Sequence, residues 1–354
     1  MKPTRREFIK TASLGLLATG FSMPAIPDFL EEYKMGIVVH SYGHRYGSKV
    51  GSSQYPGFQN TLDFMRHCHA IGAGGIQIGV GTWFGEMGQK VRDAREELGM
   101  YLEASIAMPE GETDVDRFEN EVLLAKEAGV KVIRTVCLGG RRYENFKSRE
   151  EFEAFKVYSI QRIQLAEKVV RKHQMKLAIE NHKDWKAAEL VEILQNLSSE
   201  WVGATVDFGN NISLLEYPDE VIETLAPFAF STHVKDMGVQ EYEEGFLLSE
   251  VPLGKGIVKL KKGIELCKNY HPDVNISLEM ITRDPLKIPC FSENYWQTFE
   301  YPSSKKFKRY LQMIGKESFD GKLPSISNLG EEEILALEEN NVVDCLRYYG
   351  KLNS

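Results

Sequence analysis

Three features are scarce or absent in this 354-residue sequence, and each excludes a class of protein. Acidic residues outnumber basic ones by 51 to 43 and the basic residues form no block, so the chain offers no cationic surface for nucleic-acid phosphates. The five cysteines are widely spaced without a Cys-x-x-Cys pair, which excludes a disulfide framework and a zinc–thiolate site. No apolar run spans a bilayer comfortably. The hydrophobic fraction of 42% is instead typical of a soluble globular protein with a substantial core.

The first 30 residues differ from the rest of the chain. A basic start precedes a short, weakly apolar stretch from Leu14 to Ala25. The segment Thr4–Lys10 (TRREFIK), an arginine pair with phenylalanine two residues later, resembles a twin-arginine export signal. That resemblance implies a periplasmic protein, and a basic first helix is the structural alternative. Because no clear small-x-small cleavage site follows, retention of residues 1–30 as a membrane anchor stays open.

From residue 35 onward, short β-rich apolar runs alternate with longer amphipathic stretches. The alternation predicts a closed (β/α)8 TIM barrel over residues 31–315, because parallel strands need helical crossovers. An open doubly wound sheet is the alternative, but no Gly-rich phosphate turn follows the first run. Residues 316–354 are predicted to form a C-terminal helical extension, with an acidic helix over Glu331–Tyr349. The eight predicted strands are Gly36–Tyr42, Gly75–Val80, Tyr101–Ala107, Val132–Cys137, Lys176–His182, Val202–Asn210, Ala229–Asp236 and Val274–Met280.

The last four predicted strands each carry an ionisable residue at the carboxyl end: Glu180, Asp207, His233 and Glu279. Active sites of such barrels lie at this end, so the four side chains are expected to share one space. Three carboxylates so close would repel one another, and a divalent cation removes that conflict. Each residue alone is equally compatible with an ion pair or a helix N-cap, but four at one depth favour a metal site. The oxygen-rich set suits one Mn²⁺, with Mg²⁺, Co²⁺ or Zn²⁺ also compatible.

Other residues near these strand ends are candidates for substrate binding. The two-residue period of a strand places His182 on the side of Glu180, and Lys235 on the side of His233. His40, at the end of the first predicted strand, is a further candidate for substrate binding. A buried core histidine with its hydrogen bonds satisfied is the alternative. Arg141 and Arg142, in the loop after the fourth strand, could bind substrate oxygens, but the favoured interpretation is that they are solvated loop charges. The remaining candidates are Arg134 and, in an aromatic loop that either covers a sugar or packs on the barrel rim, Trp296.

Three local motifs on consecutive strands resemble the xylose isomerase-like barrel superfamily, the sugar phosphate isomerase/epimerase group. They are Glu-Asn-His at 180–182, Asp-Phe-Gly-Asn at 207–210 and His-Val-Lys-Asp at 233–236. The resemblance implies that Glu180 and Glu279 bind the metal and also act as an acid/base pair. Asn210 stands where several relatives carry a histidine, and we assign it to substrate binding. The endonucleases of this superfamily need further His and Asp ligands that this chain lacks.

The predicted function is therefore that of a divalent-metal-dependent sugar isomerase or epimerase. A carboxylate removes a proton next to a carbonyl, and the metal stabilises the resulting enediolate before the proton returns. The export signal favours a non-phosphorylated sugar or keto-sugar, because sugar phosphates are kept in the cytoplasm. A 3-keto-glycoside lyase, which expels a leaving group from the same enolate, is one alternative. A non-catalytic sugar-binding protein is another, and a homo-oligomer is compatible with the sequence.

Overall fold

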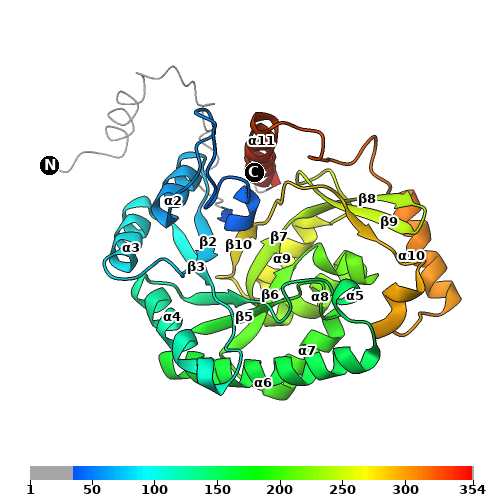
Figure 1. Ribbon diagram of the computed structural model, residues 1–354, viewed down its shortest axis with the longest axis horizontal. Coiled ribbons are helices and arrows are strands. Elements are labelled where there is room, and N and C mark those ends of the chain that lie inside the picture. The colour runs from blue at the N-terminus through cyan, green and yellow to red at the C-terminus, as the bar shows by residue number, and fades with distance from the viewer. Residues whose placement is uncertain (1–34, 353–354) are drawn as a thin grey trace.

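The computed structural model describes residues 35–352 of the chain. Eight parallel strands close into a barrel in the order β1-β10-β7-β6-β5-β4-β3-β2 (Figure 1). This confirms the predicted TIM barrel, because each predicted run contains one barrel strand. The predicted leader, residues 1–30, lies outside the described residues. The barrel strands are β1 (Gly36–Val38), β2 (Gly75–Gly79), β3 (Tyr101–Ser105), β4 (Val132–Thr135), β5 (Lys176–Glu180), β6 (Val202–Asp207), β7 (Ala229–Val234) and β10 (Asn275–Leu278).

Helices surround the barrel and contribute apolar side chains to its core (Figure 1). Their ends follow local sequence signals. Asn60 caps the first of them by accepting bonds from the backbone nitrogens of Leu62 and Asp63, at 2.9 and 3.1 Å. The helices are α2 (Thr61–Ala70), α3 (Met87–Leu98), α4 (Val115–Glu127), α5 (Arg142–Asn145), α6 (Arg149–His173), α7 (Ala187–Leu197), α8 (Pro218–Leu225), α9 (Leu260–Tyr270), α10 (Ser304–Lys316) and α11 (Glu331–Leu352). Short 3-10 helices are η2 (Val39–Tyr42), η3 (Glu112–Asp114), η4 (Asn210–Leu214), η5 (Ala226–Phe228) and η6 (Glu293–Thr298).

The amino-terminal end of the barrel is filled by the ring of Tyr101. A Cβ atom added to Gly36 would lie 2.1 Å from the Tyr101 hydroxyl, and one added to Gly75 would lie 2.4 Å from its ring. Glycine at these two strand starts therefore makes room for the tyrosine. The Tyr101 hydroxyl donates to the carbonyl of Ile276 at 3.0 Å. This plug leaves the opposite end, where the acidic residues stand, as the open end of the barrel.

The loops after β7 and β10 form a second sheet that the sequence analysis did not predict. Strands β8 (Asp236–Tyr242) and β9 (Gly245–Val251) make an antiparallel hairpin, and β11 (Leu286–Ile288) pairs with β9. The chain enters β8 almost directly from β7, so this sheet stands beside the carboxyl end of the barrel (Figure 1). The sheet extends that side of the barrel beyond the strand ends.

The C-terminal helical extension is confirmed, and its helix α11 packs on the loops after the first and last barrel strands. The backbone nitrogen of His44 donates to Glu338 at 2.8 Å, and Arg45 pairs with Glu339. The Asn341 amide donates to the Thr282 hydroxyl at 3.0 Å. The extension therefore joins the two ends of the barrel sequence at the rim that carries the strand ends.

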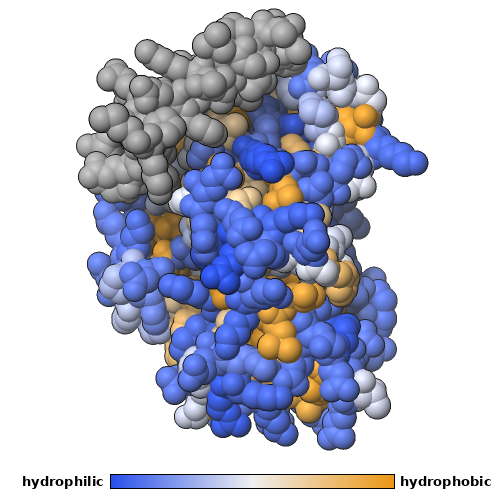
Figure 2. All heavy atoms as spheres, turned by 90° about the vertical axis from the view of Figure 1, so that its left-hand side faces the viewer, coloured by the Kyte–Doolittle hydropathy of each residue, from blue (hydrophilic) through white to orange (hydrophobic). Residues whose placement is uncertain are grey.

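The surface in Figure 2 is mostly hydrophilic, with hydrophobic residues in small groups between polar ones. Within residues 35–352, no helix is long and apolar enough to cross a membrane. All five cysteines are free thiols buried in the protein.

Candidate metal centre

Four side chains from neighbouring barrel strands converge at the open end of the barrel. Glu180 ends β5, Asp207 ends β6, His233 lies near the end of β7, and Glu279 directly follows β10. Each offers a ligand atom, these atoms lie within 4.8 Å of one another, and all four residues are buried. The structure thus brings together the four residues selected from the sequence. Their role as metal ligands stays a prediction.

The imidazole of His233 lies in the middle of this cluster. Its Nδ1 atom is 3.4 Å from Glu180 Oε2, 3.5 Å from Glu279 Oε1 and 3.9 Å from Asp207 Oδ2. Among the described residues, this buried nitrogen has no hydrogen-bond partner. Buried polar atoms without partners are rare in native proteins, and a ligand or ion is a common explanation. An imidazole nitrogen facing three carboxylate oxygens is a donor set that fits one divalent cation.

Polar residues inside the barrel form hydrogen bonds that hold His233 in place. The sequence analysis missed them. His233 Nε2 donates to the Gln77 carbonyl oxygen at 2.7 Å, and the Gln77 amide nitrogen donates to Glu103 at 2.8 Å. Glu103 also accepts bonds from Ser231 at 2.6 Å and Asn275 at 2.8 Å. Their signal in the sequence is one polar residue in the middle of each apolar run, Gln77 in β2 and Glu103 in β3.

Two cations predicted to bind substrate lie against the carboxylates of the cluster. Arg134, in β4, donates from Nε to Glu180 Oε2 at 2.6 Å. The Lys235 ammonium lies 2.8 Å from Asp207 Oδ2 and also pairs with Glu279. Both side chains are almost fully buried, so they hold two sides of the cluster in place. Their contact with a substrate stays a prediction.

The charges in the cluster depend strongly on one another. Burial opposes ionisation of Glu180, yet Arg134 and His233 hold its pKa well below the ordinary value. Burial, with the negative charges of Glu180 and Glu279, raises the pKa of Asp207 in spite of Lys235. Burial opposes the charged form of His233, but Glu180 and Glu279 raise its pKa to about 9. Without an ion, the imidazole therefore holds a proton among the carboxylates, and a metal would compete with that proton.

The other predicted site residues divide into two groups. His40 Nδ1 lies 3.0 Å from Glu279 Oε1 with its side chain 49% exposed, and the Asn210 amide donates to Glu180 Oε1 at 2.9 Å. These two contact the cluster. His182 instead pairs through Nδ1 with the carbonyl of Leu138 at 2.9 Å, and burial lowers its pKa to about 4. Trp296 donates to the carbonyl of Cys290 at 2.9 Å, and its role toward a sugar stays a prediction.

Residues 65–295 match the xylose isomerase-like TIM barrel family. The chain belongs to this family. A curated relative, the 3-oxo-isoapionate decarboxylase of Pectobacterium atrosepticum, is 32% identical over 88 residues, which cover 24% of this chain. The chain spans only 32% of that relative's length.

Solved structures of similar fold include a xylose isomerase-like TIM barrel protein from Mycobacterium smegmatis in complex with magnesium. It is 14% identical, with a TM-score of 0.54, over 81% of this chain and 98% of that one. An L-ribulose 3-epimerase is 12% identical, with a TM-score of 0.53, over 91% of this chain and 98% of the other. At this identity the likeness shows the shared fold.

One loop residue of this family member differs from the sequence interpretation. Arg142 is buried, although the sequence analysis assigned it to a solvated charge. Its guanidinium donates to Thr298 at 3.1 and 2.7 Å, pairs with Glu189 at 2.7 Å and lies 3.4 Å from the centre of the Phe152 ring. Arg142 therefore fixes the aromatic loop after β10 to helix α6, and it is unavailable as a free loop charge. A pattern of two adjacent arginines could not show which one turns inward.

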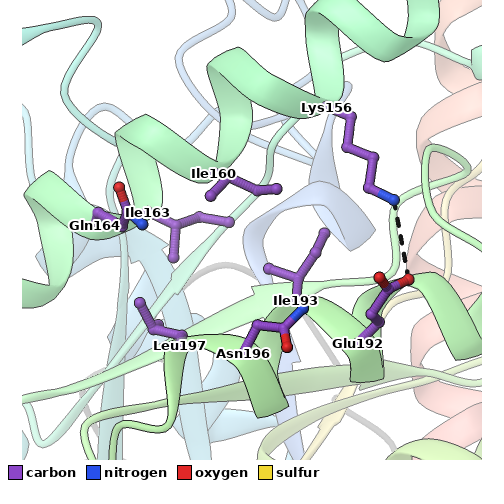
Figure 3. Close-up of a pocket in the computed structure, with 8 residues that line it drawn as sticks. All are labelled: Lys156, Ile160, Ile163, Gln164, Glu192, Ile193, Asn196 and Leu197. Carbon is purple, nitrogen blue, oxygen red and sulfur yellow. Dashed lines mark ion pairs between the residues drawn. The ribbon is translucent and has the colours of Figure 1, made fainter.

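A hollow on the outer side of the barrel is separate from the metal cluster. Figure 3 shows its lining side chains, which come from helices α6 and α7 and carry no strand-end residue. Lys156 and Glu192 form an ion pair across it at 3.9 Å. The cluster at the strand ends, rather than this hollow, is therefore the candidate functional site of the barrel.

Proposed function

We propose that this family member is a divalent-metal-dependent isomerase or epimerase that acts on a non-phosphorylated sugar or keto-sugar. The observation that carries the proposal is the buried Nδ1 atom of His233, which faces three carboxylates and has no hydrogen-bond partner in the described residues. The carboxylate oxygens lie 3.4 to 3.9 Å from this nitrogen, beyond good hydrogen-bond distance, and an ion between them would satisfy all four groups. The predicted export signal supports a substrate without phosphate.

Glu180, Asp207, His233 and Glu279 would hold the ion, and this donor set suits Mn²⁺ while also accepting Mg²⁺, Co²⁺ or Zn²⁺. When bound, the ion supplies a Lewis acid that polarises a carbonyl and stabilises negative charge on adjacent oxygens. Gln77 and Glu103 keep His233 oriented for this task from inside the barrel.

Glu180 and Glu279 are the proposed proton-transfer pair. They stand on strands separated by β6 and β7 around the barrel, with His233 between them. Asn210 holds Oε1 of Glu180, and Lys235 pairs with Oε2 of Glu279, so both carboxylates have fixed orientations. One takes a proton from the carbon next to the carbonyl, and the other returns a proton to the opposite face or to the neighbouring carbon. Burial keeps water away from both steps.

A 3-keto-glycoside lyase is the second candidate, and the position of His40 favours it. This imidazole contacts Glu279 at 3.0 Å, yet half of its side chain is exposed at the barrel mouth. After Glu180 or Glu279 removes the proton next to the carbonyl, the electron pair forms a C=C bond and expels the glycosidic oxygen. His40, in its protonated form, can donate the proton that the leaving oxygen takes.

Incubation of Mn²⁺-loaded protein in D₂O tests both candidates. The substrates are D-fructose, D-tagatose, and glucosides oxidised at C3, with chelator-treated protein as the control. Deuterium at the carbon next to the carbonyl, with the glycosidic bond intact, supports the isomerase or epimerase. Release of the aglycone supports the lyase. Neither event on any of these compounds, or equal rates after chelation, would contradict the proposal.

The variant Glu279→Gln separates catalysis from sugar binding. Glutamine keeps an oxygen for the metal but cannot accept the substrate proton, so exchange should fall by about 10²-fold or more. Metal content, measured by elemental analysis, should stay near that of the wild type. Glu244→Gln, in the exposed turn between β8 and β9, is the matched control. Unchanged exchange in Glu279→Gln would remove this residue from the acid/base pair.

A further inference from the structure

Lys183, three residues after Glu180, has a left-handed backbone with φ of 67°. The other non-glycine residues of positive φ in the described part, Gln174, Ser198 and Leu215, each end a helix. Lys183 ends none and lies in the loop between β5 and α7. Strained backbone away from a helix end is found most often at functional sites, where the surrounding structure enforces it.

The surrounding loop holds Lys183 in this conformation. Its carbonyl accepts a bond from the backbone nitrogen of Arg142 at 3.0 Å. The carboxylate of the next residue, Asp184, accepts bonds from the backbone nitrogens of His182 at 3.1 Å, Trp185 at 2.8 Å and Leu138 at 3.2 Å. These bonds connect the loop to the ends of β4 and β5, so the position of the lysine is fixed by the barrel itself.

The Lys183 side chain is largely buried and has no partner within residues 35–352. The residue is only 5% exposed, and its ammonium makes no hydrogen bond or ion pair with any residue between 35 and 352. Its nitrogen is not among the fully enclosed polar atoms without a partner, so it keeps some contact with solvent. Removing most of the water around a cation without supplying a partner is unfavourable, and largely buried cations are normally paired. Lys183 thus combines two unfavourable features, a strained backbone and an unpaired charge, three residues after the proposed ligand Glu180.

Charges of the candidate metal centre act on Lys183. Burial and the cations Lys235 and Arg283 lower the pKa of Lys183 to about 8, while Asp207 and Glu250 act in the opposite direction. Both of these carboxylates already have a cation. Asp207 lies 2.8 Å from the Lys235 ammonium, and Glu250 accepts a bond from Arg283 at 3.1 Å. Within residues 35–352, Lys183 is therefore a cation that no carboxylate pairs with.

We propose that Lys183 binds a carboxylate of the substrate, so that the substrate is a sugar acid or keto-sugar acid rather than a neutral sugar. This inference rests on the proposed function for the location of the substrate, and it adds the chemical class. A carboxylate at the ammonium would supply the missing partner through charge-assisted hydrogen bonds. The rigid loop would then set the distance between that carboxylate and the reacting carbons.

Binding measurements on matched pairs of compounds test the proposal. Calorimetry compares D-glucuronate with D-glucose, D-galacturonate with D-galactose, and D-gluconate with D-glucitol. Because carboxylates also bind metals, each pair is measured on Mn²⁺-loaded and on chelator-treated protein. The wild type should bind the acid of at least one pair about tenfold or more tightly than its neutral partner in both states. Lys183→Met, which keeps the aliphatic stem, should lose that preference without weaker binding of the neutral compound.

Two further variants distinguish loss of the acid preference from misfolding. Lys183→Gly removes the charge at a backbone conformation that glycine adopts readily, so it should fold and should lose the preference as Lys183→Met does. Lys168→Met, on the exposed face of α6, should behave as the wild type. Equal binding of acids and neutral compounds by the wild type, or a preference that survives in Lys183→Met and Lys183→Gly, would overturn the proposal. A Lys183-dependent preference for D-glucose 6-phosphate over D-glucuronate would overturn the assignment to a carboxylate.

The D₂O exchange experiment distinguishes failure of this inference from failure of the proposed function. Exchange on neutral ketoses, with no acid preference in the wild type, refutes the carboxylate site and leaves the isomerase or epimerase standing. A Lys183-dependent acid preference, with no exchange or cleavage on any compound including the acids, supports the site and refutes the proposed chemistry.

Discussion

The amide of Gln77 determines which nitrogen of His233 faces the carboxylates. Gln77 donates from its nitrogen to Glu103 at 2.8 Å, so its oxygen is directed at His233 Nε2, 2.7 Å away. An oxygen there accepts a hydrogen bond, and Nε2 therefore carries a hydrogen. Metal-binding histidines are commonly oriented by such a bond to the second ring nitrogen. The barrel interior thus prepares Nδ1 as the ligand atom.

Replacement of Gln77 by leucine should weaken metal binding without removing any proposed ligand. The Nε2–H group of His233 would lose its acceptor, and the imidazole would no longer be held in one orientation. Loss of such a supporting residue typically lowers metal affinity by about 10–100-fold. Titration calorimetry with Mn²⁺ measures the change. Gln89→Leu, on the exposed face of α3, is the control, and equal affinity in the two variants would contradict the orienting role of Gln77.

Addition of Mn²⁺ should stabilise the folded protein, and a chelator should reverse the effect. An ion that binds only the folded state adds about 2.7 kcal/mol at a free concentration 100 times its Kd. Thermal unfolding with and without Mn²⁺ measures this as a rise in Tm.

Asp207→Asn is the informative control for that rise. The asparagine oxygen can still accept the bonds that Asp207 Oδ1 receives from the backbone nitrogens of Gly209 and Asn210, at 2.9 and 2.7 Å. With its oxygen held there, the amide nitrogen takes the place of Oδ2, the atom that faces the cluster. The variant should therefore fold but respond weakly to Mn²⁺, whereas the glutamine of Glu279→Gln can turn its oxygen toward the ion. If its Tm rises as much as that of the wild type, the ion binds elsewhere.

The sequence was sufficient for the barrel because its strands are buried on both faces and therefore form continuous apolar runs. Glu180, Asp207 and Glu279 were identifiable for the same reason, since each charge directly follows such a run. The hairpin of β8 and β9 was missed because the barrel pattern leads one to expect a helix after the seventh strand. The two strands have seven residues each but are buried on both faces over most of their length, so they lack the two-residue alternation that marks a hairpin.

The polar support of the site could not be derived from local patterns. Gln77 and Glu103 each occupy one inward position of a strand, and their partners Ser231, His233 and Asn275 lie far away in sequence. Only closure of the barrel brings these strands together. The unpaired state of Lys183 is also a property of the folded site, because it depends on which cations Asp207 and Glu250 already pair with.

Arg142 and Arg141 are adjacent but should differ sharply in their effect on stability. Arg142→Ala removes two bonds to Thr298 and the contact with Phe152, and it leaves Glu189 without its cation. The expected loss is about 2–4 kcal/mol of unfolding free energy. Arg141→Ala removes a partly exposed pair with Glu144 and should change stability by less than about 0.5 kcal/mol. Urea denaturation of both variants measures the difference, and equal losses would contradict a specific clamp at Arg142.

The neighbouring residues Glu338 and Glu339 should give opposite pH dependences of stability. Burial raises the pKa of Glu338 to about 7 from an ordinary value of 4.5. Between these values the folded protein holds more protons than the unfolded chain, so Glu338 lowers stability as the pH rises through this range. The full loss, reached above pH 7, is about 3 kcal/mol. Glu338→Gln should therefore raise the free energy of unfolding at pH 8 and change it little at pH 4.5.

Glu339 provides the matched comparison on the same helix. Burial disfavours its charge, but His67 and Arg45 lower its pKa, so its stabilising contribution is present at neutral pH and is lost as the pH falls. Glu339→Gln should lower the free energy of unfolding at pH 8, because it leaves buried Arg45 without its carboxylate. Chemical denaturation of both variants between pH 4.5 and 8 measures the two trends. If Glu338→Gln also loses stability at pH 8, the carboxyl of Glu338 is stabilised in its charged form, and its unpaired Oε2 atom has a partner in solution.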